Sequence, residues 1–384
     1  MPSTTTSAAT SAATTATTDT LTTPSTRRHA VFHRLRVASV DPLTDDAVAV
    51  TFDVPEDLRE EFRFRAGQHL TVRAPQLEGD VRRNYSICAP ATGQMLRIGV
   101  KRIPDGVFSA FVFEHLALGD ELEVMTPTGT FCPDLDPSQS RRYVAVAAGS
   151  GITPVLSILS TALAVEPGST AALVLANRRP SSIMFLEELE ALKNTYPDRF
   201  QLLHVLREEG PGVDLLAGRL DPDRLRRILD TVLPADDVDE WFLCGPLTVT
   251  ESVREVLLDR GVDAAHVHRE LFHVGASPAR ERRTPPSGDP GQGSAVTVVL
   301  DGRSTTVTVP RDGDSVLAAT LRVRSDAPFA CTNGVCGTCR ARVLEGAVEM
   351  DTNYALEPDE VDAGMVLSCQ SHPVTDTVTV DYDQ

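Results

Sequence analysis

The stretch CTNGVCGTC, Cys331 to Cys339, places three cysteines within nine residues. A fourth, Cys369, is separated from Cys339 by 29 residues, so the spacing is C-x4-C-x2-C and then a distant cysteine. Four thiolates at this spacing are typical ligands of a [2Fe–2S] cluster. A zinc site, which more often uses two C-x2-C pairs, and a disulfide knot are the alternatives. Because only one C-x2-C occurs here, we predict that Cys331, Cys336, Cys339 and Cys369 bind a [2Fe–2S] cluster.

Two glycines between these cysteines fit the same chemistry. Gly334 and Gly337 have no Cβ, so the loop can adopt positive φ and fold closely around the cluster. We expect its N–H groups to turn toward the cluster sulfurs.

Length and composition narrow the class of protein. A chain of 384 residues predicts two to four domains, and 41% hydrophobic residues suffice for ordinary cores. No apolar run approaches the roughly 18 residues of a membrane span, so no membrane partner is expected. The first 26 residues hold twelve Thr and no Lys or Arg, which fits neither a secretory signal nor a transit peptide. We expect a disordered tail over 1–28 and a cytoplasmic protein, and the scattered Cys88, Cys132 and Cys244 also suit a reducing compartment.

The charge distribution bears on partners. The formal net charge of −18 argues against nucleic acid, whose phosphates need a basic face. From Glu345 to Gln384 there are ten Asp or Glu and no Lys or Arg. This segment is either a solvated face or a surface that steers a basic redox partner, and both alternatives stay open.

The chain divides into three regions with different sequence patterns, two of them separated by a linker. A linker rich in Pro, Gly, Ser and Arg spans 274–294. After it, over 295–384, two strands around Asp301-Gly302 form a predicted hairpin, followed by a helix, the cysteine loop and a last strand, which fits a small β-grasp domain. Over 29–137 short strands separated by turns predict an antiparallel β-barrel. Over 138–273 strands alternate with helices, which predicts an α/β domain with a parallel sheet.

The barrel region carries a candidate flavin site in RNYS, at a predicted strand start. A flavin needs an aromatic surface for its ring, a hydrogen-bond donor near the reactive N5 and a cation for its phosphate. Tyr85, Ser86 and Arg83 offer these three groups. An ordinary edge strand is the alternative.

A second part of that site is expected downstream, in GVFSAFVFEHL. Gly106 ends a turn, and Ser109 could cap a short helix whose N–H groups accept a pyrophosphate. Lys101 and Arg102 either face the same anion or are solvated strand ends.

The α/β region opens with a strand and then AAGSGITP, which is not the G-x-G-x-x-G fingerprint. Gly149 and Gly151 permit close backbone approach at the carboxyl end of the strand, and Thr153 and Pro154 open a helix. This placement suits the phosphates of a dinucleotide.

The segment after the next strand bears on the choice of dinucleotide. Arg178 stands there, where a dinucleotide with a 2′-phosphate wants Arg and one with a free ribose wants an acid. NADPH is therefore favoured and NADH stays possible, since an arginine facing solvent is the alternative.

Two further residues are placed beside the nicotinamide. Cys244 of CGP follows a buried strand at the carboxyl edge of the sheet, or else it is a packed core cysteine. Glu270, which we expect to end the last strand before the linker, either handles protons at the flavin or is a surface carboxylate.

Several motifs occur in an order that resembles a known family. Together they resemble the ferredoxin–NADP⁺ reductase superfamily fused to a plant-type [2Fe–2S] ferredoxin, from about residue 30 onward. The motifs are AGQH (66–69), RNYS (83–86), GVFS (106–109), AGSGITP (148–154), CGP (244–246) and the cysteine loop. Within that superfamily, NRRPSSIMFLEEL (177–189) and the ending from Asn353 resemble the reductase subunits of phenylacetyl-CoA epoxidases.

The resemblance implies roles for the candidate residues. It implies FAD at Arg83, Tyr85 and Ser86, with Ser109 on its pyrophosphate. It implies dinucleotide phosphates at Gly149, Gly151, Thr153 and Pro154, a ribose contact at Arg178, and hydride transfer beside Cys244 and Glu270. The chain departs from chloroplast-type reductases because a linker follows Phe272 where a C-terminal aromatic would shield the flavin.

The implied function is electron transfer. We expect NADPH to deliver a hydride to FAD, and FAD to pass single electrons to the [2Fe–2S] cluster. The implied acceptor is a di-iron epoxidase acting on phenylacetyl-CoA. Another oxygenase, such as a steroid hydroxylase, is the first alternative, and a redox-sensing module without turnover is the second.

Overall fold

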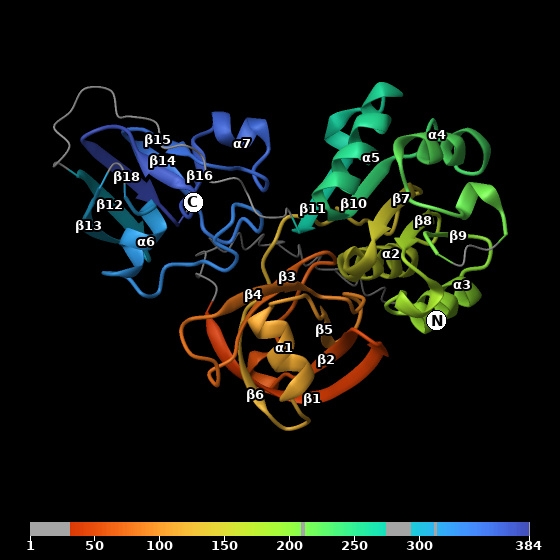
Figure 1. Ribbon diagram of the computed structural model, residues 1–384, viewed down its shortest axis with the longest axis horizontal. Helices are drawn as coiled ribbons and strands as arrows, with labels where there is room; N and C mark the ends of the chain where they lie inside the picture. The colour runs from red at the N-terminus through yellow and green to blue at the C-terminus, as the bar shows by residue number, and fades with distance from the viewer. Residues whose placement is uncertain (1–30, 209–211, 274–292, 311–312, 384) are drawn as a thin grey trace, which may run out of the picture.

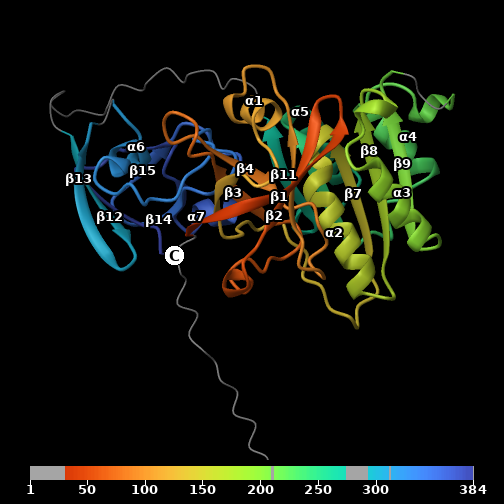
Figure 2. The ribbon, with the colours of Figure 1, turned by 90° about the horizontal axis from the view of Figure 1, so that it is seen from below.

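The computed structural model describes residues 31–208, 212–273, 293–310 and 313–383 (Figure 1). The predicted tail and nearly all of the predicted linker lie outside these residues. The chain forms a β-barrel domain, an α/β domain and a C-terminal domain, and the view from below places the barrel strands between the other two (Figure 2). Among the described residues, no helix is both long and apolar enough to cross a membrane.

The barrel domain contains one antiparallel sheet in the order β4-β3-β6-β1-β2-β5. An antiparallel bridge between Ile87 and Ile98 joins the region after β4 to β5, so the sheet closes on itself as predicted. Alternating side chains such as Leu35 and Val37 fill the interior. The elements are β1 (Phe32–Thr44), β2 (Ala47–Asp53), β3 (His69–Arg73), β4 (Arg82–Ser86), β5 (Leu96–Lys101), β6 (Glu121–Met125) and α1 (Val107–Glu114).

The α/β domain has five strands in the order β11-β10-β7-β8-β9, and every pair is parallel, as predicted. Its strands are near-continuous apolar runs because helices cover the sheet. The strands are β7 (Arg142–Ala148), β8 (Thr170–Asn177), β9 (Phe200–Leu206), β10 (Glu240–Pro246) and β11 (Val267–His273). The helices are α2 (Ile152–Val165), α3 (Leu186–Thr195), α4 (Pro222–Thr231) and α5 (Leu247–Asp259).

The C-terminal domain has a mixed sheet in the order β13-β12-β18-β14-β16, in which β12 and β18 are parallel. The predicted hairpin is confirmed, with φ of 54° at Asp301 and 66° at Gly302, the positive values of a type I′ turn. The elements are β12 (Ser294–Leu300), β13 (Arg303–Val309), α6 (Val316–Leu321), β14 (Arg340–Glu345), β15 (Val348–Met350), α7 (Pro358–Asp362), β16 (Met365–Leu367), β17 (Ser371–Pro373) and β18 (Thr377–Asp381).

Single turns of 3-10 helix complete the described secondary structure. They lie at Glu56–Leu58, Gly149–Gly151, Pro180–Ser182, Asp214–Leu216 and Ala264–His266.

One apolar cluster joins the first two domains. Ala47, Ala49 and Cys88 of the barrel side pack in the same buried cluster as Ile152 and Val155 of α2. The barrel and α/β domains are therefore held by a shared core, which fixes the edge where their site residues meet.

Candidate active site and metal centre

Three residues from distant parts of the sequence meet between the barrel and α/β domains. Ser86 ends β4, and its Oγ donates a hydrogen bond of 3.0 Å to Glu270 Oε2. Cys244 on β10 is the direct neighbour of Glu270 across the parallel β10–β11 pair. The structure thus brings the predicted Ser86, Cys244 and Glu270 together. Glu270 lies inside β11 and does not end it, which corrects the sequence expectation.

Burial sets the protonation of this group. It raises the pKa of Glu270 to about 7, against the smaller opposing effect of the Ser86 hydrogen bond. Burial, with a further contribution from Glu270, also raises the pKa of the Cys244 thiol well above its ordinary value. Near neutral pH, Glu270 can hold or release a proton, whereas Cys244 stays a neutral thiol.

His69 is a member of the site to which sequence reasoning gave no role. It pairs with Ser86 across β3 and β4, and its Nδ1 lies 3.9 Å from Glu270 Oε1. Burial lowers its pKa to about 4, so the imidazole is neutral at pH 7. Its Nε2 lies 3.0 Å from Asn84 Nδ2. His69 belongs to the AGQH motif, but nothing in the neighbouring sequence indicates that it lies near Glu270.

The flavin candidates lie on β4. RNYS covers the second to fifth residues of this strand, so it begins one residue after the strand start. The Tyr85 ring packs on Phe108 of α1 with centroids 5.6 Å apart, and burial raises the pKa of Tyr85. Arg83 is exposed, with Nη1 donating to the carbonyl of Arg82 at 2.7 Å. An aromatic face and a cation are therefore available on the Tyr85 side of the strand.

The start of α1 differs in detail from the prediction. Gly106 is the N-cap residue, and Ser109 lies inside the first turn, so the predicted capping role of Ser109 was wrong. Its buried Oγ donates to the Gly106 carbonyl at 3.1 Å and accepts from the Ile103 N–H at 3.3 Å. A Cβ at position 106 would lie 2.5 Å from this Oγ, which is why glycine is needed there.

A cavity of about 460 Å³ opens at this helix start. It is lined by Asp46, Ala110 and the 102–107 turn. Lys101 Nζ donates to Asp46 Oδ1 at 2.9 Å, beside the cavity, so the predicted cation lies near the helix N–H groups but is paired. The N–H groups at the first turn of α1 are of the kind that accepts a pyrophosphate, whereas Lys101 and Arg102 are paired with Asp46 and Glu114.

The glycines of AAGSGITP do two different things. Gly149 has φ of 56°, a left-handed conformation that favours glycine. A Cβ on Gly151 would lie 2.2 Å from the Cys244 carbonyl oxygen, so this glycine lets the loop cross β10. Thr153 and Pro154 lie in the first turn of α2, and Thr153 Oγ1 donates to the Ser150 carbonyl at 3.1 Å. The loop and helix start sit at the carboxyl edge of the sheet, as a dinucleotide site requires.

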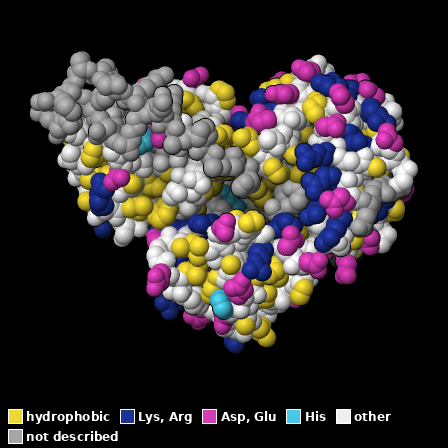
Figure 3. All heavy atoms as spheres, in the orientation of Figure 1, with side chains coloured by type: hydrophobic (Ala, Val, Ile, Leu, Met, Phe, Trp, Pro, Cys, Tyr) yellow, Lys and Arg dark blue, Asp and Glu magenta, His cyan; other side chains and the backbone are white. Residues whose placement is uncertain are grey.

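Arg178 follows β8, and an acid lies beside it in space. Its Nε donates to Glu208 Oε1 at 3.0 Å, and Arg207 contacts the same oxygen at 3.1 Å. Hydrogen bonds from Arg207 and Arg178 lower the pKa of Glu208. This carboxylate follows β9, so the segment after β8 gives no sign of it in the sequence. Lys and Arg side chains form a row on the α/β domain, on the side that faces the notch between the two upper lobes (Figure 3).

The four predicted cluster cysteines form two pairs. The Cys336 thiol is hydrogen-bonded to Cys331, which lowers the pKa of Cys331, and the Cys339 thiol is bonded to Cys369 and lowers its pKa in the same way. In the described part of the chain, no group of three or more His, Cys, Asp or Glu side chains is arranged to hold a single metal ion. Two thiol pairs match a two-iron cluster, in which four cysteines serve two irons.

The loop around these cysteines has the predicted backbone. Gly334 and Gly337 have φ of 72° and 68°. The N–H of Asn333 lies 3.4 Å from Cys331 Sγ, and N–H groups of Val335 and Gly334 bond to Cys331 and Cys369. Such N–H groups stabilise cluster sulfurs, so the residues present fit a [2Fe–2S] cluster.

A cavity of about 980 Å³ connects the two centres. His69 comes from the barrel domain, Glu270 from the α/β domain, and Cys336 and Thr338 from the C-terminal domain, and all four line it. The proton-handling group and the cluster loop therefore face one space at the junction of the three domains.

Comparisons with known protein families agree with this division. A 2Fe-2S iron-sulfur cluster binding domain matches residues 298–374, an oxidoreductase NAD-binding domain matches 145–255, and an oxidoreductase FAD-binding domain matches 34–132. FAD, NAD(P)H and a [2Fe–2S] cluster are thus the cofactors of this chain, which is an NAD(P)H-dependent oxidoreductase.

Whole-length relatives share this order of domains. One subunit of the 1,2-phenylacetyl-CoA epoxidase from Escherichia coli (strain K12) is 43% identical over 92% of this chain and 98% of its own length. The ferredoxin reductase component of 3-ketosteroid-9-alpha-monooxygenase from Rhodococcus rhodochrous is 36% identical over 91% of this chain and 96% of its own length. Both of these relatives are components of oxygenase systems.

A solved structure shares the three-domain fold. Phthalate dioxygenase reductase aligns with a TM-score of 0.57 and 24% identity, over 91% of this chain and 98% of its own. The identities and coverage of the curated relatives, with the site geometry above, place the chain in the ferredoxin–NADP⁺ reductase superfamily, among the oxygenase reductases that carry a plant-type [2Fe–2S] ferredoxin domain.

Proposed function

We propose that this chain is the reductase component of a phenylacetyl-CoA epoxidase, carrying electrons from NADPH to a di-iron oxygenase component in the cytoplasm. The observation that carries the proposal is the 43% identity to one subunit of such an epoxidase over nearly the whole of both chains. The cavity shared by Glu270 and the cluster loop supports an electron-transfer role, because the residues beside the proposed flavin and the cluster loop line one space.

The proposed roles follow the domains, with 29–137 binding FAD, 138–273 binding the dinucleotide and 295–384 binding the cluster. When bound, FAD accepts a hydride from the nicotinamide and gives up its electrons one at a time, which is chemistry that the cofactor supplies. Tyr85 covers one face of its ring. Arg83 and the N–H groups after Gly106 hold its phosphates, and Ser109 fixes the turn that presents them.

The nicotinamide side is proposed to rest on the α/β domain. Gly149, Gly151, Thr153 and Pro154 shape the loop and helix start that receive the pyrophosphate. Arg178 contacts a 2′-phosphate in place of Glu208, which favours NADPH over NADH.

Ser86 and Glu270 are proposed to move a proton. The carboxyl group of Glu270 has a pKa near the pH of the cell and bonds to the Ser86 hydroxyl. Ser86 Oγ can pass a proton between Glu270 and a donor or acceptor in the cavity, while the Cys244 thiol fills the space beside them without ionising.

The reductase of another oxygenase is the alternative function. It is favoured by the 36% identity to a 3-ketosteroid-9-alpha-monooxygenase reductase over 91% of this chain. Both functions use the same site. They differ in the oxygenase partner, so the residues that recognise this partner distinguish one function from the other.

Reconstitution with different oxygenase components tests the proposal. The purified protein is mixed with NADPH and either a phenylacetyl-CoA epoxidase or a 3-ketosteroid hydroxylase, and product is measured by chromatography. We expect epoxide only with the first partner. Product only with the steroid enzyme would support the alternative, and reduction of cytochrome c without product from either would overturn both partners.

A further inference from the structure

Strand β4 turns alternate side chains toward different partners. Arg82 and Asn84 contact the C-terminal domain, and Ser86 contacts the α/β domain through Glu270. Arg83 and Tyr85 lie on the opposite face of the same strand, because side chains of a strand alternate. Arg82 and Asn84, which flank the proposed flavin ligand Arg83, therefore have a separate task.

Arg82 makes a buried contact across the domain boundary. Its guanidinium carbon lies 3.9 Å from the centroid of the Phe329 ring, and its Nη1 lies 3.5 Å from the Ala327 carbonyl oxygen. The residue is 4% exposed, so this cation–π contact is shielded from water and correspondingly strong. Phe329 lies two residues before Cys331, at the start of the cluster loop.

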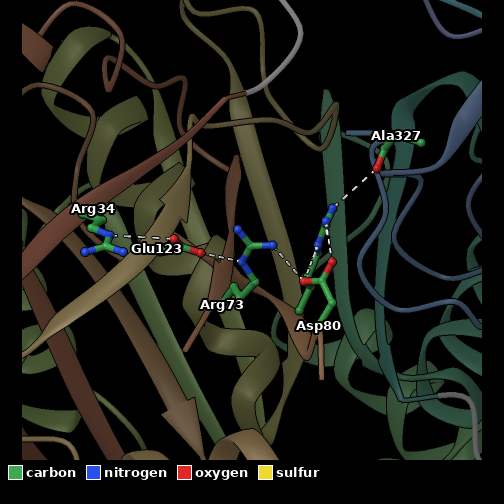
Figure 4. Close-up of polar contacts among 6 residues, drawn as sticks. Arg34, Arg73, Asp80, Glu123 and Ala327 are labelled. Atoms are coloured by element: carbon green, nitrogen blue, oxygen red, sulfur yellow. Dashed lines mark hydrogen bonds and ion pairs between the residues drawn. The ribbon is translucent and has the colours of Figure 1, made fainter. Parts of the chain in front are cut away.

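Ion pairs hold the Arg82 side chain in place. Asp80 Oδ2 accepts from Arg82 Nη2 at 2.6 Å, and Asp80 also pairs with Arg73 at 3.1 Å. Arg73 pairs in turn with Glu123 at 2.6 Å. Figure 4 shows this series of contacts running from Arg34 through Glu123, Arg73 and Asp80 to the Ala327 carbonyl. The guanidinium is thus oriented by the barrel domain before it meets the C-terminal domain.

Asn84 makes the second contact. Its Nδ2 lies 2.9 Å from Thr338 Oγ1, and Thr338 stands between Cys336 and Cys339. The same amide nitrogen lies 3.0 Å from His69 Nε2. A single hydrogen bond, between Asn84 and Thr338, therefore links the cluster loop directly to the strand that carries Tyr85 and Ser86.

We propose that Arg82 and Asn84 are positioning residues, which hold the cluster loop against the flavin-binding strand so that electrons cross from flavin to cluster at one fixed distance. The proposal rests on the electron path proposed above and adds the two contacts that set its geometry. A separate ion pair joins the α/β domain to the C-terminal domain, with Arg269 Nε 3.3 Å from Glu357 Oε1.

Two variants separate positioning from folding. Arg82→Gln removes the cation over Phe329, while Asp80 keeps its pairing with Arg73. Thr338→Val removes the hydroxyl that meets Asn84 and also bonds to Cys336, and it preserves the shape of the side chain. Arg63→Gln is the matched control, because Arg63 forms an exposed ion pair with Glu60 within the barrel domain.

The first measurement needs no turnover. Amide hydrogen exchange of the oxidised holoenzyme is followed over 327–339 in all variants. We expect exchange there to rise about tenfold in Arg82→Gln, since a tenfold change corresponds to about 1.4 kcal/mol and a desolvated cation–π contact is of that size. We expect a smaller rise in Thr338→Val and none in Arg63→Gln. Exchange equal to the unmodified protein in both test variants would overturn the proposal.

The second measurement divides the electron path. Stopped-flow spectra with NADPH give the rate of flavin reduction and then that of cluster reduction. We expect both test variants to reduce flavin within about twofold of the normal rate and to lose tenfold or more in cluster reduction, because small displacements of reacting groups are costly. An equal loss in both steps, or in neither, would contradict a positioning role. If the unmodified protein never reduces its cluster with NADPH, the electron path itself fails, which is a distinct result.

Discussion

Ser86 and Glu270 are 184 positions apart in the chain, and a hydrogen bond of 3.0 Å joins them. The bond crosses from the barrel domain to the α/β domain and connects the Ser86 hydroxyl, a proposed flavin contact, to a carboxyl whose pKa is about 7. A carboxyl with this pKa changes its charge within the physiological range, so the reaction is expected to depend on pH.

Replacing Glu270 tests its role in proton transfer. Glu270→Gln should lower kcat for NADPH-driven cytochrome c reduction by about 100-fold and remove an inflection near pH 7, as expected for loss of a general acid–base group. Ser86→Ala should move the inflection to higher pH, because the Ser86 hydrogen bond lowers the pKa of Glu270. Glu78→Gln, at an exposed position, serves as the control. An unchanged pH profile in Glu270→Gln would assign the inflection to another group.

The same pKa predicts a stability effect. Since burial raises the pKa of Glu270 from 4.5 to about 7, the folded protein binds a proton more tightly than the unfolded chain. The stabilisation is complete below pH 4.5 and is lost as the pH rises toward 7 and above. Chemical denaturation at several pH values should show this decline in the normal protein and a flatter profile in Glu270→Gln. Parallel profiles would contradict the prediction.

The cluster pairs predict the effect of removing one ligand. Cys336→Ser should lose the visible absorbance of the cluster and most of its iron, while flavin absorbance and ferricyanide reduction by NADPH remain. Cytochrome c reduction should fall to a few per cent. Cys132→Ser, a cysteine outside the loop, should keep its iron. A full cluster spectrum in Cys336→Ser would remove this residue from the ligand set.

The pairing of Arg178 with Glu208 predicts opposite effects on dinucleotide preference. Arg178→Ala should raise KM for NADPH about tenfold and leave that for NADH nearly unchanged, since a charge-assisted hydrogen bond contributes about 1.5–3 kcal/mol. Glu208→Gln should lower KM for NADPH by releasing the arginine. Steady-state kinetics with both nucleotides measures this, and equal changes for NADPH and NADH would show that the 2′-phosphate is not bound there.

Close packing at Gly151 predicts a loss of stability. A Cβ there would lie 2.2 Å from the Cys244 carbonyl oxygen, so Gly151→Ala must shift one of two buried backbones. We expect a loss of roughly 1–3 kcal/mol, the usual cost of overpacking. Thermal unfolding measures it, with Gly93→Ala as control, because the nearest atom to a Cβ there is 3.9 Å away. Equal melting temperatures would show that the loop moves aside freely.

Local features were readable from the sequence. The hairpin at Asp301-Gly302 and the glycines of the cysteine loop were predicted because positive φ is a property of single residues. The parallel and antiparallel sheets followed from strand and helix periodicity. The role of Ser109 was predicted wrongly because a serine near the start of a helix can be the N-cap residue or lie within the first turn. The sequence pattern is the same in both cases.

Contacts between domains were not readable. Arg82 meets Ala327 across 245 positions and Asn84 meets Thr338 across 254, and neither segment has a pattern that indicates the other. The pairing of Glu208 with Arg178 was not predicted for the same reason, because Glu208 lies in the segment after the neighbouring strand β9. The local sequence indicates what each segment can bind. Which segments come into contact depends on how whole domains pack.

The two-sided use of β4 limits how this strand can evolve. Single substitutions change one partner at a time, but an inserted or deleted residue would exchange the two faces. Such a change would turn Arg82 and Asn84 away from the C-terminal domain and Tyr85 away from Phe108, so that the proposed flavin contact and the route to the iron would be lost together. Among homologous enzymes, the amino acids of this segment should therefore differ far more often than its length.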